Sequence, residues 1–276
     1  MRDGPSSSLC IGDLHGLVEK LLKVVRSEIY GDNVRFGIPN IFHGDAVDGG
    51  PQAQNYLTLK LLIQEVLAKR LVWLPGNHDW SLYRLVLAIM RYLDKKADTV
   101  DFKPKENQER LVEELFALKE DEFRSFAKTF MYVFECLPRF VRVNNTYFAH
   151  AGWDNQMLSA EDVSNRGKAI RVRRGIYTAR LSVSETYGQN ERALLGWGMT
   201  ENNDITGAII KDPPVAEDGR KRFLVIGHHT NAVVKAERVH CIDTGCGKVL
   251  PDGSEGYLTA VMVNTIEGNI LRTFTF

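Results

Sequence analysis

An aspartate and a histidine lie two residues apart near the start of the chain, in the stretch Gly-Asp-Leu-His-Gly at residues 12–16. A short apolar run precedes this stretch and a segment with helical periodicity follows it, so we expect a strand to end and a helix to begin there. Residues two apart in an extended strand end point to the same side. Asp13 and His15 would then present a carboxylate and an imidazole to one point, which is half of a metal site.

Four further predicted strands also end in Asp, Asn or His. The stretches that follow these strands are His-Gly-Asp-Ala-Val-Asp-Gly-Gly at 43–50, Gly-Asn-His-Asp at 76–79, His-Ala-Gly at 150–152 and Gly-His-His-Thr at 227–230. Open α/β sheets place their sites at the carboxyl ends of strands, so we expect these stretches to converge. Carboxylate oxygen, amide oxygen and imidazole nitrogen together suit hard or borderline divalent cations.

Two such ions about 3.5 to 4 Å apart form a clamp for in-line displacement at phosphorus and lower the pKa of a shared water. Asp45 can bridge them, because a carboxylate can give one oxygen to each ion. His78 directly follows the candidate ligand Asn77, so we expect it to point away from the ions and to protonate the departing oxygen as a general acid. Asp48 could accept a hydrogen bond from the far nitrogen of His78 and fix its tautomer.

The elements that position these motifs alternate between strands and helices, which predicts an α/β layered fold. We expect a single domain over residues 1–276, with a helical insertion at about 80–137 that caps one side of the core. The other predicted helices cover 17–28 and 51–69. The predicted strands cover 9–11, 37–42, 71–74, a hairpin at 140–143 and 146–149, 223–226, 232–242, 257–263 and 270–276.

The charge of the chain limits the classes of partner. Thirty-five basic and thirty-five acidic residues give a formal net charge of zero, which argues against a nucleic-acid coat protein or a membrane-surface binder. We find no apolar run long enough for a spanning helix and no signal-peptide core, and we expect a cytoplasmic protein without membrane contact. The four cysteines have no paired spacing, so we expect reduced thiols.

The motifs Gly-Asp-x-His-Gly, Gly-Asp-x-x-Asp and Gly-Asn-His, in this order, resemble those of the calcineurin-like metallophosphoesterases, in their phosphoprotein-phosphatase-like branch. The stretches at 148–152, 242–245 and 256–260 are similar to those of bacterial diadenosine tetraphosphatases and related small phosphatases. The resemblance implies a two-sheet β-sandwich flanked by helices. It also implies two divalent ions, with Mn²⁺ as our first choice and Fe, Zn, Ni, Co or Mg as alternatives.

Carried onto this sequence, the resemblance implies three ligands for the first metal, Asp13, His15 and Asp45. For the second metal it implies Asp45, Asn77, His150 and His228. His78 with Asp48 would form the acid pair. The alignment of Gly-His favours His228 over His229 as the ligand, and the role of His229 stays open. We expect Asp243, at a turn beside a glycine, to be a structural hydrogen-bonder.

The chain departs from the pattern at two positions. Gly49 and Pro75 stand where the branch often has arginine. A charge-assisted hydrogen bond contributes about 1.5 to 3 kcal/mol, so its loss would weaken the hold on phosphate by about one to two decades. A basic run at 166–174 offers replacements, and from it we name Arg171, Arg173 and Arg174 as candidate phosphate ligands. The alternative is that this run is a solvated loop.

These observations predict a two-metal phosphoesterase that hydrolyses a phosphomonoester or a phosphoanhydride. Its substrate would be a phosphorylated small molecule, a nucleotide such as a dinucleoside polyphosphate, or a phosphoprotein. One alternative is a catalytically weak scaffold, in which the metals hold the fold and the helical insertion docks a partner. Another is a nucleic-acid end phosphatase, which the neutral charge disfavours. The physiological substrate, the native metal and the oligomeric state stay open.

Overall fold

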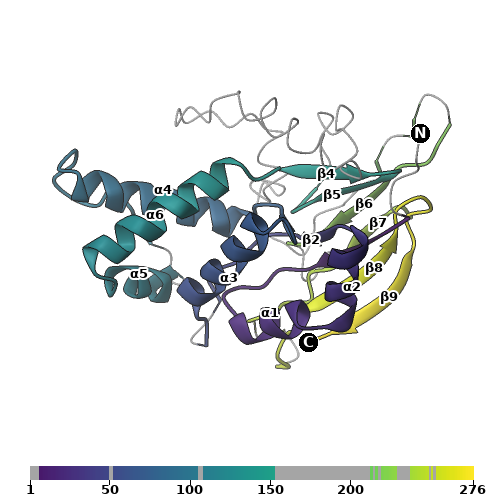
Figure 1. Ribbon diagram of the computed structural model, residues 1–276, viewed down its shortest axis with the longest axis horizontal. Helices are drawn as coiled ribbons and strands as arrows, with labels where there is room; N and C mark the ends of the chain where they lie inside the picture. The colour runs from purple at the N-terminus through teal and green to yellow at the C-terminus, as the bar shows by residue number, and fades with distance from the viewer. Residues whose placement is uncertain are drawn as a thin grey trace.

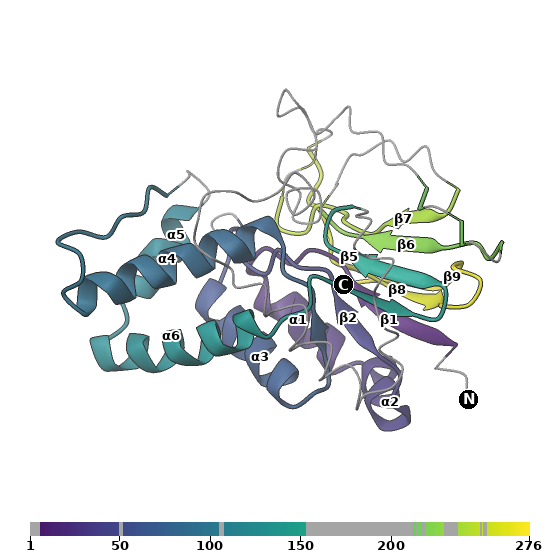
Figure 2. The same cartoon turned by 90° about the horizontal axis from the view of Figure 1, so that it is seen from above.

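The computed structural model describes residues 6–49, 52–104, 108–152, 212–213, 215–216, 219–228, 237–248, 250 and 253–276. Two β-sheets lie against each other in this part of the chain (Figures 1 and 2). The five-stranded sheet has the order β3 (Val72–Trp73), β2 (Asn40–Phe42), β1 (Ser7–Ile11), β8 (Thr259–Asn264) and β9 (Ile270–Thr275). The four-stranded sheet has the order β4 (Phe140–Val143), β5 (Thr146–Ala149), β6 (Phe223–Ile226) and β7 (Val239–Cys241).

The alternation of side chains along the strands builds two cores. In β1, Leu9 and Ile11 pack into the core shared with the helices, whereas Cys10 between them packs into the core between the two sheets. This is the period of two that a strand buried on both faces requires. The core between the sheets also contains Ile41, Leu74, Val141, Val143, Phe148, Val225, Ile242, Val261 and Val263.

Strand direction decides where the motifs meet. Strands β1, β2 and β3 run parallel to one another, and β5, β6 and β7 run parallel in the other sheet. Parallel strands deliver their carboxyl ends to one edge of a sheet. The five stretches that carry the proposed metal ligands follow β1, β2, β3, β5 and β6, so the two sheets present these ends together. The predicted two-sheet fold with flanking helices is confirmed.

Helices cover the outer face of the larger sheet and extend beyond it. They are α1 (Val18–Val25), α2 (Glu28–Phe36), α3 (Asn55–Leu67), α4 (Asn77–Leu93), α5 (Glu109–Phe116) and α6 (Glu120–Glu135). Helices α4, α5 and α6 project from one end of the molecule as an arm (Figures 1 and 2). Inside this arm Phe123, Phe126, Phe130 and Phe134 are buried on one face of α6, as their spacing indicates.

Three helix boundaries differ from the expected ones. The predicted helix at 17–28 ends at Val25, and a second helix begins after Ser27, whose side chain accepts a hydrogen bond from the Tyr30 amide as an N-cap. Helix α3 begins at Asn55 instead of position 51. Helix α4 begins at Asn77, three residues before the expected start, because the Asp79 carboxylate accepts a hydrogen bond from the Gly76 amide and caps the first turn.

Two further expectations concern the cysteines and membrane-spanning helices. The four cysteines are free thiols, as their spacing predicts. Within the described ranges, no helix has the length and apolar content that crossing a bilayer would require.

Candidate metal centre

The first donor group consists of Asp13, His15 and Asp45, whose ligand atoms all lie within 4.8 Å of one another. The loop after β1 is not extended as we expected, because His15 has φ 50°. The loop bends since the amides of Leu14 and His15 both donate to the Asp45 carbonyl oxygen, at 3.2 and 2.8 Å. The structure still brings Asp13 and His15 together, although by a turn and not by the period of a strand.

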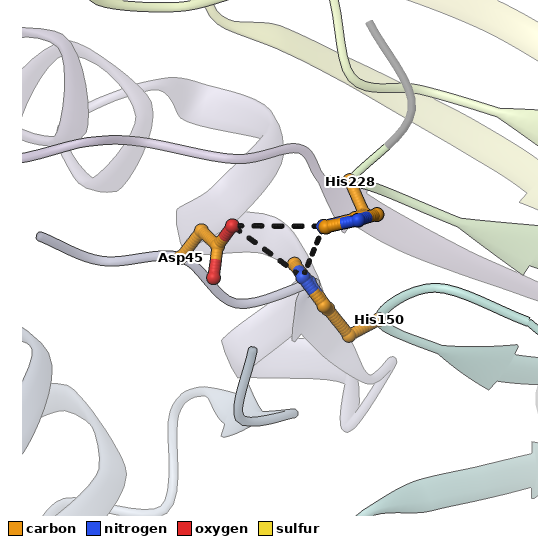
Figure 3. Close-up of side chains that lie close together, drawn as sticks. All are labelled: Asp45, His150 and His228. Carbon is orange, nitrogen blue, oxygen red and sulfur yellow. Dashed lines mark hydrogen bonds and ion pairs between the residues drawn. The ribbon is translucent and has the colours of Figure 1, made fainter. Parts of the chain in front are cut away.

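The second donor group consists of Asp45, His150 and His228, again with ligand atoms within 4.8 Å (Figure 3). The Asp45 Oδ2 atom lies 3.5 Å from His150 Nε2 and 3.9 Å from His228 Nδ1. The side-chain oxygen of Asn77 lies 3.2 Å from His150 Nε2 and adds an amide oxygen beside this group. Asp45 therefore belongs to both donor groups, and the two groups lie next to each other.

The histidine tautomers leave a lone pair directed into the centre. His15 Nδ1 lies 3.2 Å from the Val47 carbonyl oxygen and donates its proton there. His150 Nδ1 donates to the His43 carbonyl oxygen in the same way. A ring nitrogen held by a backbone carbonyl leaves the other nitrogen free to ligate a metal, which is the usual arrangement of metal-binding histidines.

A buried nitrogen of the first donor group lacks a protein partner. His15 Nε2 is buried and has no hydrogen-bond partner among the residues that the structure describes. An unsatisfied buried polar atom costs about 1 to 3 kcal/mol, so such an atom needs an explanation. A divalent cation in the first donor group would provide it. The donor set therefore fits the metal ions that the sequence predicts, and the role of these residues as ligands stays a prediction.

The pKa values show which ring nitrogens hold a proton before a metal binds. Burial lowers the pKa of His15 to about 3 and keeps this imidazole neutral, which is the form that ligates. Burial works against the charged form of His150 too, but the charge and hydrogen bond of Asp45 raise its pKa to about 10, so a metal ion that binds His150 Nε2 must displace a proton. Burial would raise the pKa of Asp45, and the charges of His150 and His78 lower it instead. Asp45 is thus a stable anion at the middle of the centre.

The backbone of the centre is strained. His15, Asp45, Asp48 and His228 have φ values of 50°, 50°, 70° and 65°, in the left-handed region. This conformation costs roughly 1 to 2 kcal/mol for each residue with a Cβ atom. Such strain persists only where surrounding contacts fix the backbone, and it concentrates at functional sites. All four were singled out for their chemistry, whereas three other described non-glycine residues with positive φ, Lys69, Lys95 and Asn144, have no proposed role at the centre.

His78 faces the centre instead of pointing away from it. Its Nδ1 atom lies 2.9 Å from Asp48 Oδ2, and its Nε2 atom lies 3.9 Å from Asp45 Oδ2. The expectation that His78 would turn away assumed an extended backbone after β3. Asn77 and His78 are instead the first two residues of α4, where neighbouring side chains are about 100° apart. The expected contact between His78 and Asp48 is present.

A glutamine from the helical arm also contacts Asp48. Gln108 is buried and its Nε2 atom donates to Asp48 Oδ2 at 2.8 Å and to Ser81 Oγ at 2.8 Å. The arm therefore helps to hold the carboxylate that orients His78. Gln108 was not predictable from the sequence, because it lies 60 residues from Asp48 without a neighbouring motif.

The structure explains why no arginine stands at position 49. A Cβ atom built on Gly49 would lie 1.7 Å from the His15 carbonyl oxygen. No side chain fits there unless the backbone moves, and the loop after β1 fills the space.

Pro75 is buried between β3 and α4. The proposed replacements Arg171, Arg173 and Arg174, and also His229, lie outside the described residues.

Lys248, which the sequence analysis missed, contacts Asp243 beside the centre. Lys248 follows β7, and its Nζ atom lies 3.5 Å from Asp243 Oδ2. The other oxygen of Asp243 accepts a hydrogen bond from the Gly245 amide at 2.8 Å, the structural role that we expected for Asp243. Lys248 has no motif around it, and the one signal that could have pointed to it is that β7 is a further parallel strand whose end reaches the same edge.

The family of the chain follows from comparison with known proteins. A model of the calcineurin-like phosphoesterase family matches residues 7–252. The chain belongs to the calcineurin-like phosphoesterases. It is accordingly a metal-dependent phosphohydrolase of a family with binuclear centres, and the structure supplies two groups of Asp and His that could hold metal.

Similar proteins carry related names. The chain is 28% identical over 252 residues to the bis(5'-nucleosyl)-tetraphosphatase PrpE [asymmetrical] of Bacillus subtilis (strain 168), covering 86% of this chain and 84% of the relative. It is 26% identical over 257 residues to the protein of the same name from Geobacillus sp. (strain WCH70), with the same coverage. A crystal structure provisionally described as that of a diadenosine tetraphosphatase superposes on this chain with a TM-score of 0.50. The two chains are 17% identical, and the match covers 98% of this chain and 93% of the other. The two proteins share the fold.

The carboxylate of Asp79 connects the loop after β2, the strand β3 and the start of α4. Its Oδ1 atom accepts a hydrogen bond from the Ala46 amide at 2.8 Å. Its Oδ2 atom accepts from the Gly76 amide at 2.9 Å and from Trp73 Nε1 at 3.1 Å. Asp79 is fully buried, so the loop after β2 and the start of α4 depend on this one carboxylate for their spacing.

We expect Asp79→Ala to lower the free energy of unfolding by at least about 3 kcal/mol, because three buried donors lose their acceptor. Urea unfolding followed by circular dichroism measures this. Asp98→Ala is the control, since Asp98 is an exposed loop residue and should change stability by less than about 0.5 kcal/mol. Equal stability of the two variants would contradict the role of Asp79.

Proposed function

We propose that the chain hydrolyses a phosphoanhydride bond of a dinucleoside polyphosphate, with two divalent ions held in the two donor groups. Asp13, His15 and Asp45 would hold the first ion, and Asp45, Asn77, His150 and His228 the second. The observation that carries this proposal is the membership of Asp45 in both groups. A shared carboxylate can give one oxygen to each of two neighbouring ions, the arrangement of a two-metal clamp for displacement at phosphorus.

The ions and the side chains would have separate tasks. When bound, two divalent ions lower the pKa of the attacking water and withdraw charge from the phosphoryl oxygens. Asp45 keeps the two groups at a fixed separation, because its backbone carbonyl accepts the amides of the loop that carries His15. The Asp45 Oδ1 atom also accepts a hydrogen bond from the His78 amide at 3.0 Å, which fixes α4 relative to the same carboxylate.

His78 is the proposed general acid. Its Nδ1 proton is held by Asp48, so Nε2 is the atom that faces the centre. Burial disfavours the charged imidazolium, but the carboxylates of Asp45 and Asp48 raise the pKa of His78 above its ordinary value. A raised pKa favours the imidazolium form, which can deliver a proton to the departing oxygen.

The relatives support the choice of substrate. Two proteins that share 28% and 26% identity with most of this chain are named bis(5'-nucleosyl)-tetraphosphatases. The donor groups alone are compatible with monoesters as well, since the same clamp serves any in-line displacement at phosphorus. Manganese is the metal that we propose to test first, because a mixed set of carboxylate, amide and imidazole donors suits it.

The direct test is phosphate or nucleotide release by the purified chain with Mn²⁺. Diadenosine tetraphosphate, p-nitrophenyl phosphate and a phosphoserine peptide should be compared by kcat/KM, and we expect the tetraphosphate to rank first. We expect His78→Ala to lower kcat by about 10²- to 10⁴-fold, the usual contribution of a general acid. Asp45→Asn should lose activity as well, because both donor groups lose a charge.

The control for Asp45→Asn is Asp98→Asn, which makes the same change on an exposed loop and should leave turnover intact. Full activity of both Asp45→Asn and His78→Ala would show that the assigned roles are wrong. If the phosphopeptide ranks first instead, the metal centre stands and the proposed substrate does not.

The pH profile tests the His78–Asp48 pair separately. Activity that needs protonated His78 is lost as pH rises through the pKa of His78, and Asp48 raises that pKa. Asp48→Asn should therefore move the alkaline limb of the kcat profile to lower pH and reduce kcat by about 10- to 100-fold. Asp98→Asn should leave the limb in place. An unmoved limb in Asp48→Asn would mean that His78 is not the group that titrates.

A further inference from the structure

Gln108, the residue before α5, connects Asp48 to the helix that carries His78. Its side-chain amide nitrogen has two hydrogens. One is donated to Asp48 Oδ2 and the other to Ser81 Oγ, each at 2.8 Å. Ser81 lies three residues after His78 in α4, so their side chains lie on one face of that helix. The Gln108 amide therefore fixes the Asp48 carboxylate relative to the helix turn on which His78 stands.

The Asp48 carboxylate depends on Gln108 for its orientation. His78 Nδ1 and Gln108 Nε2 both donate to the same oxygen, Oδ2, at 2.9 and 2.8 Å. The other oxygen, Oδ1, is buried and has no hydrogen-bond partner within the described part of the chain. Removing the Gln108 amide would leave His78 to hold this carboxylate alone among the described donors, and the carboxylate could then rotate away from the ring.

A second contact from α5 reaches the backbone of Asp48. The Asp48 amide donates to Asn55 Oδ1 at 3.0 Å, and Asn55 Nδ2 donates to Glu114 Oε1 at 3.4 Å. The other oxygen of Glu114 accepts from the Tyr56 amide at 2.8 Å and so satisfies the first turn of α3. Asp48 has a φ of 70°, a conformation that persists only where the surroundings fix it. The segment from Gln108 to Glu114 thus supports both the backbone and the carboxylate of Asp48.

We propose that Gln108 is a positioning residue for proton transfer by His78. It acts through Asp48, whose fixed carboxylate holds the Nδ1 proton of His78, so that Nε2 faces the centre. This inference rests on the proposed function, because it needs a departing oxygen that receives a proton. His78 Nε2 gives its proton to that oxygen as the bond to phosphorus breaks, while Gln108 and Asp48 keep their protonation states. An arm segment without a proposed metal ligand thus takes part in the reaction.

The departing group decides how much the reaction needs this proton. p-Nitrophenolate leaves readily as an anion, whereas phenolate is a stronger base and leaves faster when it is protonated. We expect Gln108→Met, which keeps the length of the side chain and removes the amide, to lower kcat with phenyl phosphate by about 10- to 100-fold. With p-nitrophenyl phosphate kcat should fall by no more than about 3-fold. An equal fall with both esters would overturn the proposal, because damage to the fold or to the metal centre lowers both rates alike.

Three further variants sharpen this comparison. Gln108→Glu keeps the shape of the side chain and replaces the donor with an acceptor, so it should separate the two esters at least as strongly as Gln108→Met. Ser81→Ala removes the second acceptor of the Gln108 amide and should separate them in the same direction, and it serves if Gln108→Met fails to fold. Gln64→Met makes the same change on the exposed side of α3 and should leave both kcat values as they are. A Gln108→Glu variant with the rates of the original chain would overturn the proposal.

Proton NMR of the metal-free protein provides a readout that does not depend on activity. A ring N–H that donates to a buried carboxylate gives a downfield signal, because the hydrogen bond is charge-assisted and burial slows exchange with water. We expect such a signal in the original chain and in Gln64→Met, and its absence from His78→Ala assigns it. Gln108→Met should broaden or abolish the signal. An unchanged signal in Gln108→Met would overturn the proposal, as would its absence from the original chain.

The failure of this inference differs from the failure of the proposed function. If the original chain hydrolyses none of the phosphate compounds with any divalent metal, the proposed function fails, and the NMR signal still reports whether Gln108 holds the pair of Asp48 and His78. If the original chain is active and Gln108→Met changes both esters equally or neither of them, only the role of Gln108 fails.

Discussion

The rest of the centre depends on the contacts that Asp45 makes with the loops around it. Its carboxylate lies in both donor groups, and the residue also organises the backbone around it. Its carbonyl oxygen accepts the amides of Leu14 and His15, and its Oδ1 atom accepts the amide of His78. These contacts fix the loops after β1, β2 and β3 around one anion, and they offset the cost of left-handed φ values at His15 and Asp45.

Glycines make this convergence sterically possible. A Cβ atom on Gly76 would lie 2.2 Å from Asp45 Oδ1, and one on Gly227 would lie 2.1 Å from Asp13 Oδ1. Both glycines directly precede a proposed ligand, so each allows a carboxylate from another strand to lie against the backbone. The same crowding excludes a side chain at Gly49.

Much of this arrangement was predictable from short stretches of the sequence. The apolar runs and the Asp, Asn and His residues after them predicted the strands, the edge where they end and the residues that meet there. The shape of the loops was not predictable, because the φ value of His15 depends on hydrogen bonds to Asp45, 30 residues away. The orientation of His78 depended on a helix start set by Asp79, and Lys248 had no motif around it.

The central claim is that Asp45 joins two metal sites, and anomalous scattering from crystals grown with Mn²⁺ tests it most directly. The account predicts two anomalous peaks about 3.5 to 4 Å apart, with one oxygen of Asp45 in contact with each. One peak near His15 and the other near His150 would complete the agreement. A single peak, or two peaks of which only one contacts Asp45, would contradict the account.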